Sequence, residues 1–206
     1  MTAQRKLQRD QATPSGDTKA DILAAADRLL PELGLAGATS RKIAAEAGTT
    51  VASINYYFGS KDGLITEVVA SHMVPVMREM ATRIESGEAI DEADPVRSIL
   101  HAYSMMMLVG CMTDPILREA MGVLFSKPDL ARTWRINNID PYLERITDVL
   151  AGHLSHLDYR ESRRRMNLFV DSISGQIIKR MGFEPDRDPL EGLDEFVDFM
   201  TIAVKA

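Results

Sequence analysis

Polar side chains gather between Thr39 and Lys61, in a segment that reads TSRKIAAEAGTTVASINYYFGSK. Hydroxyl, guanidinium and ammonium groups can hold phosphate oxygens, and an Asn side chain can pair with adenine through two hydrogen bonds. Val and Ala side chains can meet the methyl group of thymine. Together, these residue types are typical of a protein surface that reads double-stranded DNA.

The apolar residues of the same segment have the spacing of a helix-turn-helix. Two short helices can cross steeply only if the first carries a small residue at the crossing, here Ala44. The tight turn needs a residue that tolerates a positive φ, here Gly48, and Ile43, Val51 and Ile54 can seal the contact. The alternative is a plain helical hairpin within a bundle.

Helices must position these groups, and helical spacing of apolar residues continues along the chain. Ser40 and Ser60 are suitable N-caps for the second and fourth helices. No segment shows strand alternation, so the sequence predicts an all-α fold of about nine helices. We expect them over about 17–33, 40–47, 51–57, 61–84, 95–112, 114–125, 128–154, 160–181 and 189–204.

Charge is distributed unevenly along this chain of 206 residues, whose formal net charge is −6. Residues 1–61 carry eight Lys or Arg and six Asp or Glu, so an acidic body follows a mildly basic head. The longest apolar run, Met105–Met112, is too short to span a bilayer, and Cys111 is the only cysteine. With no signal-peptide pattern, we expect a cytoplasmic protein with no membrane association.

The segment TSRKIAAEAGTTVASINYYFGSKDGL and the preceding ILAAADRLLPELGLAGAT resemble the N-terminal domain of the tetracycline-repressor (TetR) family. The shared pattern is a first helix ending near Gly, a Thr–Ser start, IA..AG, and an aromatic run ending in Phe before Lys. The match covers about residues 18–70. It implies an all-α homodimeric regulator whose N-terminal helices bind an operator and whose C-terminal helices bind a ligand and dimerise.

Three segments follow from this reading: a flexible arm (1–16), a helix-turn-helix DNA-binding domain (17–62) and a ligand-binding and dimerisation domain (63–206). In the arm, Arg5, Lys6 and Arg9 can enter a minor groove or form a solubilising tail. Family members often carry an aromatic residue where Asn55 stands, so this sequence departs from the family pattern at that position. The candidate DNA-binding residues are Thr39, Ser40, Arg41, Thr49, Thr50, Val51, Ala52, Ser53, Asn55, Tyr56 and Lys61.

The helix 95–112 is apolar on nearly every face yet carries His101 and Tyr103. Methionine is common in adaptable pockets, although Met and aromatic residues at helical spacing also form ordinary cores. Given the resemblance, we expect a pocket for a small hydrophobic ligand with one or two polar groups. Its candidate residues are His101, Tyr103, Met105, Met106, Met112, Arg118, Phe125, Trp134 and Asn138.

The last two helices carry apolar faces that suit a symmetric four-helix dimer contact. Those faces comprise Met166, Phe169, Val170, Ile173, Ile177, Leu193, Phe196, Val197 and Met200. The alternatives to this function are a DNA-binding regulator without a small-molecule effector and a small helical enzyme. No catalytic motif is present. His153 and His156, with Asp158 near, could bind a metal with a third ligand, but an ordinary helix terminus is the favoured interpretation, so we expect no enzyme activity, cofactor or metal.

Overall fold

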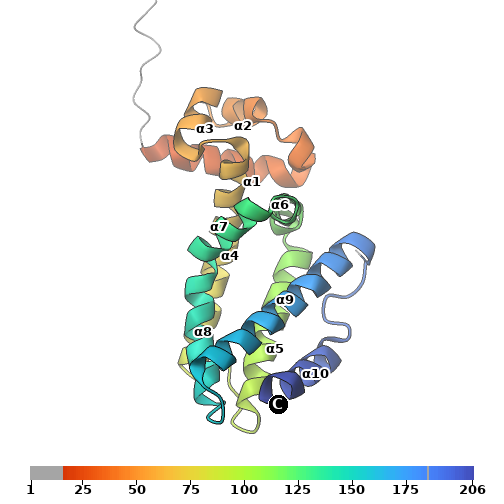
Figure 1. Cartoon of the computed structure of the whole chain (residues 1–206). Helices are drawn as coiled ribbons and strands as arrows, with labels where there is room; N and C mark the ends of the chain where they lie inside the picture. The colour runs from red at the N-terminus through yellow and green to blue at the C-terminus, as the bar shows by residue number, and fades with distance from the viewer. Residues whose placement is uncertain (1–15, 185) are drawn as a thin grey trace, which may run out of the picture. The chain divides into compact units, whose positions relative to one another are not determined.

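The computed structural model describes the backbone of residues 16–184 and 186–206, with side chains except at 16, 17, 119–123 and 125. All the regular elements in these ranges are helices, which confirms the all-α prediction (Figure 1). Nearly all of the expected N-terminal arm, including Arg5, Lys6 and Arg9, lies outside the described residues. The ten helices are α1 (Gly16–Gly37), α2 (Ser40–Glu46), α3 (Val51–Phe58), α4 (Lys61–Glu85), α5 (Pro95–Thr113), α6 (Pro115–Ser126), α7 (Pro128–Asn138), α8 (Asp140–Gly152), α9 (Tyr159–Phe183) and α10 (Leu193–Lys205).

The tenth helix arises because the stretch expected as one helix over 128–154 is broken at Ile139. Pro141 lies in the first turn of α8. A proline cannot donate a backbone hydrogen bond and restricts the residue before it, so the preceding helix must end. Pro141 was the signal in the sequence that marked this break.

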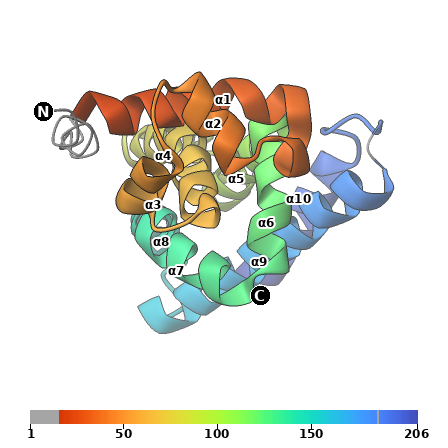
Figure 2. The same ribbon diagram turned by 90° about the horizontal axis from the view of Figure 1, so that it is seen from above.

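The helices form two compact units, Met1–Val68 and Val69–Ala206, and α4 contributes residues to both. In the first unit, α1, α2 and α3 contact one another in pairs (Figure 2). Ile22 and Leu30 of α1, Ile43 of α2 and Ile54 of α3 have no exposed surface. At Gly34 the backbone leaves the helical conformation (φ 64°, ψ 174°), where the sequence predicted that the first helix would end.

The turn between α2 and α3 has the geometry that its sequence predicted. Gly48 adopts a φ of +64°, which residues with a Cβ rarely adopt. Ala44 is 3% exposed, and its carbonyl accepts a hydrogen bond from the backbone N–H of Thr49 at 2.8 Å. These features fix the helix-turn-helix in its compact form.

In the second unit α5 is the central helix, because it contacts α6, α8, α9 and α10, with α9 crossing it at a slant (Figure 1). Ile99, Leu100 and Leu108 of α5 are buried in this core. The prediction that α5 is covered on every side is wrong. His101 and Met106 are only half-buried, and Met105 is 42% exposed.

The apolar faces predicted for dimerisation point into the chain's own core. Eight of the nine residues are buried and Phe196 is half-buried, because these faces of α9 and α10 pack against α5 and against each other. A dimer contact on the last two helices must therefore use other residues. The exposed large apolar and aromatic side chains there are Tyr159 (47% exposed), Leu168 (51%), Ile178 (45%), Phe183 (83%), Phe199 (69%) and Ile202 (71%).

Candidate nucleic-acid interface and ligand cavity

The start of α3 is held by the two threonines that precede it. Thr50 has an extended backbone (φ −117°, ψ 159°), and its hydroxyl accepts a hydrogen bond from the backbone N–H of Ser53 at 3.3 Å. The Thr49 hydroxyl donates to the Ser53 hydroxyl at 2.9 Å. This cap satisfies one of the backbone donors that every helix start leaves free, and it orients the first turn of α3.

The polar and small side chains predicted to meet DNA are accessible on α2, α3 and their flanks. Arg41, Ala52 and Asn55 are exposed, and Tyr56 is 72% exposed while its ring contacts the edge of Tyr57 at 5.1 Å between centroids. Ser40, Thr49, Val51 and Ser53 are half-buried. An exposed helix with an amide, a phenol and small apolar residues can offer both hydrogen bonds and methyl contacts to a major groove.

Two more of the predicted DNA-binding residues have structural roles, in addition to the threonines that cap α3. Thr39, rather than Ser40, is the N-cap of α2, since its hydroxyl accepts the backbone N–H of Lys42 at 3.3 Å. Ser40 was a wrong cap assignment because either hydroxyl suits this position and only the backbone angles distinguish them. The Lys61 ammonium donates to the carbonyl oxygen of Leu35. That bond joins the start of α4 to the end of α1.

Gly63 is a residue of this region that the sequence reading missed. A Cβ at this position would lie 2.0 Å from the carbonyl oxygen of Phe58, so only glycine allows the first turn of α4 to approach the end of α3. The Ser60 hydroxyl accepts the Gly63 backbone N–H at 3.1 Å, as its predicted cap role requires. The sequence signal for this close approach is the stretch Ser60–Gly63, which reads SKDG and follows the aromatic run.

The second unit contains a cavity of about 870 Å³ between α4, the loop that follows it and α5. Binding sites for small molecules usually have volumes of about 300–1,000 Å³. The lining residues on α5 recur in pairs one turn apart, so they form a single stripe along that helix. The lining comprises Val76, Glu79, Met80, Arg83, Glu88, Ala89, Ile90, Asp91, Arg97, Ser98, His101, Ala102, Met105, Met106, Val109 and Gly110.

Three of the predicted ligand-binding residues, His101, Met105 and Met106, line this cavity. Tyr103 does not: it is 1% exposed and its ring packs against Phe169 at 5.7 Å between centroids, on the core side of α5. Met112 is also buried outside the lining, at 3% exposure. Residues two apart on a helix face in different directions, which is why His101 and Tyr103 separate.

The remaining predicted ligand-binding residues also lie outside the lining of this cavity. Arg118 donates to the carbonyl oxygen of Met112, and the Asn138 amide donates to the carbonyl oxygen of Trp134 at 2.9 Å. These side chains therefore bond to backbone rather than to the cavity. The side chain of Phe125 lies outside the described residues.

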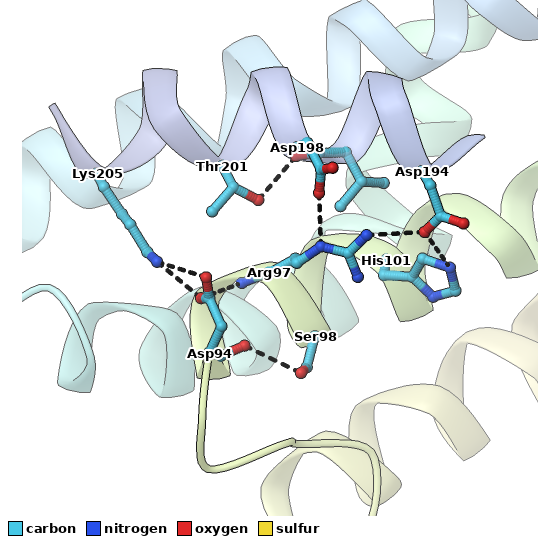
Figure 3. A network of polar contacts seen from close by, with 9 residues as sticks. Asp94, Arg97, Ser98, His101, Asp194, Asp198, Thr201 and Lys205 are labelled. Carbon is cyan, nitrogen blue, oxygen red and sulfur yellow. Dashed lines mark hydrogen bonds and ion pairs between the residues drawn. The ribbon is translucent and has the colours of Figure 1, made fainter. Parts of the chain in front are cut away.

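A polar network joins one end of the cavity to α10 (Figure 3). Arg97 donates through Nε to Asp198 at 2.6 Å and through Nη2 to Asp194 at 2.8 Å. Nε2 of His101 lies 3.7 Å from the same Asp194 oxygen. The hydrogen bonds to Asp198 and then to Asp194 raise the pKa of Arg97 above its ordinary value.

Asp94 closes this network at the start of α5. Its carboxylate caps the helix by accepting the Arg97 backbone N–H at 3.0 Å, and it accepts the Lys205 ammonium at 2.7 Å. Partial burial opposes the charge, but the bonds from Lys205 and the helix start lower the pKa of Asp94 overall. The sequence reading missed Arg97 and Asp94, whose partners on α10 are distant in the chain.

Among the residues that the structure describes, no group of three or more His, Cys, Asp or Glu side chains could hold a metal ion. His156, considered above as a ligand, donates through Nε2 to the carbonyl oxygen of Lys205 at 2.9 Å. None of the helices in the described ranges is long and apolar enough to cross a membrane.

Comparisons with known proteins agree with this geometry. Residues 22–68 match the sequence model of "Bacterial regulatory proteins, tetR family". The chain is 29% identical over 181 residues to the HTH-type transcriptional dual regulator CecR of Shigella flexneri, covering 81% of this chain and 77% of CecR.

Solved structures share the fold at lower identity. The transcriptional regulator FadR of Bacillus subtilis in complex with stearoyl-CoA has a TM-score of 0.67 at 17% identity, covering 88% of this chain and 97% of FadR. The FadR repressor of Thermus thermophilus in complex with lauroyl-CoA has a TM-score of 0.65 at 17% identity, covering 88% of this chain and 92% of that one.

Proposed function

The chain is a DNA-binding transcriptional regulator of the tetR family, and from this premise we propose that it is a repressor released from a palindromic operator by a small hydrophobic molecule. Residues 17–62 read the operator, and residues 63–206 bind the effector and dimerise. The protein acts in the cytoplasm, where the operator is. Regulators of this family are not enzymes.

The observation that carries the DNA-binding part is the capped and exposed helix α3. Its N-terminus is fixed by Thr50 and Thr49, and its outward face presents Asn55 and Tyr56. A helix that is rigidly held yet exposed along one face can enter a major groove without rearrangement. We assign base reading to Asn55 and its neighbours, and phosphate binding to Thr39, Arg41, Tyr56 and Lys61.

Selection of bound DNA from a random pool tests this part. A palindromic consensus is expected, and the logarithm of affinity should fall with the logarithm of salt by about 0.9 for each phosphate neutralised. Asn55→Ala should relax the preference for one base pair, because a bidentate base contact contributes about 1–3 kcal/mol of discrimination. Arg41→Ala should instead weaken binding to all DNA sequences alike. Binding no tighter than to bulk DNA would contradict the proposal.

Lys61→Ala is a less clean test, since Lys61 also bonds to the Leu35 carbonyl. The variant should therefore be assayed for thermal stability alongside DNA binding. Weaker binding to all sequences at unchanged stability would support a phosphate contact. A parallel loss of stability would assign Lys61 to the packing of α4 on α1.

The cavity supports an effector and argues against a regulator without one. A volume of about 870 Å³ beside Met105 and Met106 offers apolar surface that a ligand can cover. The Bacillus subtilis FadR structure, which shares this fold, is a complex with stearoyl-CoA, a ligand with a long apolar chain. The effector favours a conformer that the operator does not, and the shift is limited by its difference in affinity for the two.

A thermal-shift screen of apolar and amphipathic molecules, followed by operator titration with each hit, tests the effector. Operator DNA must weaken effector binding by the same factor that the effector weakens operator binding. A hit that stabilises the protein without changing operator affinity would contradict the release mechanism. The DNA-binding part of the proposal would then stand without it.

We assign the homodimer contact to the outward faces of α9 and α10. Leu168 and Ile178 on α9, with Phe199 and Ile202 on α10, are apolar and exposed in the isolated chain. Burying them against the same faces of a second copy gives a closed two-fold assembly. Such a dimer would carry two reading helices to operator half-sites about 34–36 Å apart.

A further inference from the structure

The charged side chains around the α4–α5 cavity differ in whether they already have a partner of opposite charge. Three carboxylates line it, those of Glu79, Glu88 and Asp91, against two guanidiniums, those of Arg83 and Arg97. Arg83 pairs with Glu88 at 3.6 Å. Among the described residues, no cation pairs with Glu79 or Asp91, and the Asp91 carboxylate accepts only the Ala93 backbone N–H at 2.9 Å. The cavity therefore presents two carboxylates without a cationic partner.

The cations of the lining are already engaged. Arg97 already pairs with Asp198 and Asp194 at 2.6 and 2.8 Å, so two carboxylates balance its charge before any anionic ligand arrives. Nε2 of His101 lies 3.7 Å from the same Asp194, so a carboxylate already stands beside its ring (Figure 3). An anion entering this cavity would meet an excess of negative charge, whereas a cation would be attracted.

The rest of the lining fits an apolar tail. By the rise of an α-helix, the stripe from Arg97 to Gly110 extends about 20 Å along α5. Beyond Met106 and Gly110 a second, smaller cavity of about 30 Å³ continues among apolar side chains, including Met73, Met107 and Leu117. Polar groups lie toward the loop end and methionines toward the other end, so a ligand with one charged head and one apolar tail would match both.

Within the part of the chain that the structure describes, the lining contains no Phe, Tyr or Trp. Quaternary ammonium ions are recognised chiefly by the faces of such rings. A protonated amine instead carries N–H donors that form short, charge-assisted hydrogen bonds with carboxylates. The chemistry of the walls thus favours an ammonium group with hydrogen atoms over a fully alkylated one.

We infer that the effector class of this cavity is a lipophilic primary or secondary amine, bound as its cation by Glu79 and Asp91 with its tail on the methionines of α5. This inference rests on the proposed function, since it names the ligand of the same cavity. It also separates this chain from regulators of the same fold whose solved structures hold acyl-CoA, which carries anionic groups.

Calorimetric titration of the full chain with three ten-carbon probes, each below its micelle concentration, tests the inference. The probes are decylammonium, decyltrimethylammonium and decanoate, which share a tail and differ in the head group. Decylammonium should bind about tenfold or more tighter than decanoate and several-fold tighter than decyltrimethylammonium, with an affinity that falls as salt rises. Decanoate or decyltrimethylammonium binding as tightly as decylammonium would overturn the inference.

Neutral isosteres locate the charge. Glu79→Gln and Asp91→Asn should each weaken the binding of decylammonium by about two- to fivefold, as expected for partly exposed ion pairs. The binding of decanoate should be unchanged or tighter. Glu92→Gln is the matched control, because Glu92 is an exposed acid in the same loop that does not line the cavity. An equal effect of Glu92→Gln would attribute the result to net charge alone and overturn the assignment to Glu79 and Asp91.

The outcomes of these experiments distinguish a failure of the amine assignment from a failure of the proposed function as a ligand-responsive repressor. Decanoate that binds and releases the operator would overturn the amine assignment and leave a ligand-responsive repressor. If none of the three probes binds, the amine assignment is overturned, and the screen of other molecules then decides whether an effector exists. Operator binding itself is measured without any probe.

Discussion

Thr50 has two roles that mutation can separate, a cap for α3 and a candidate contact to phosphate. Its side chain accepts the Ser53 backbone N–H, and its exposed position places it beside any DNA that α3 enters. Thr50→Ala removes the acceptor and costs about 1 kcal/mol, within a usual range of about 0.5–2 kcal/mol for lost N-caps. For a chain of this length that corresponds to a fall in Tm of about 2–4 °C.

The same loss should weaken operator binding by roughly fivefold or more, since 1.4 kcal/mol corresponds to a factor of ten and the ordered start of α3 presents the reading face. Thr50→Asp distinguishes the two roles. Aspartate is as good an N-cap as threonine and suits the positive end of the helix dipole, so stability should be kept. Its charge would repel phosphate, and operator affinity should fall further than in Thr50→Ala.

Thermal unfolding followed by circular dichroism measures the change in Tm, and operator titration at fixed salt measures the change in operator affinity. Thr133→Ala on α7 is the control, because Thr133 is an exposed threonine inside a helix and its replacement should not lower stability. A Thr50→Ala variant as stable as the parent would refute the cap argument. Full operator affinity in Thr50→Asp would refute the nearness of Thr50 to phosphate.

Three further predictions concern the second unit. Burial raises the pKa of Cys111 to about 12, so at pH 8 its thiol should react with a disulfide reagent roughly a hundredfold or more slower in the native chain than in urea. Hydrogen bonds from Arg164 and then Arg165 lower the pKa of Glu161 from 4.5 to about 2, so its contribution to stability is complete above pH 4.5 and is lost as the pH falls towards 2. The difference in unfolding free energy between the parent and Glu161→Gln should therefore shrink across that window in acid titrations. Phe199→Asp should convert the dimer to a folded monomer in sedimentation experiments, since this side chain is 69% exposed in the isolated chain; an unchanged dimer would move the contact away from α10.

Local patterns in the sequence were sufficient for the secondary structure and the helix-turn-helix. Ala44, Gly48 and Ile54 act on neighbours within ten residues, so their spacing alone indicates the crossing of α2 and α3. Proline and hydroxyl caps act over three or four residues, and Ser60 was identified correctly for that reason. Where such signals were misread, at Ser40 and Ile139, the deciding information was still local: a backbone angle in one case and Pro141 in the other.

The sequence could not decide which apolar face a helix turns inward. Helical periodicity marked Phe169 and Val197 as one side of α9 and α10, but a face that meets α5 and a face that meets a second copy have the same composition. For the same reason, the methionines of α5 could not be divided between core and cavity. Met112 is buried while Met105 and Met106 line a cavity, because only the positions of α4 and α9 around α5 determine which stripe is covered.

The sequence by itself determined the helices, the turn and the residues that the reading helix presents, since each depends on contacts within a few residues. Tertiary structure alone decided the chemistry of the cavity. The charge of Arg97 is balanced within the chain because Asp194 and Asp198, about a hundred residues later, reach its guanidinium. Pairing of charges over that separation depends on how α10 packs against α5, which no local pattern of residues encodes.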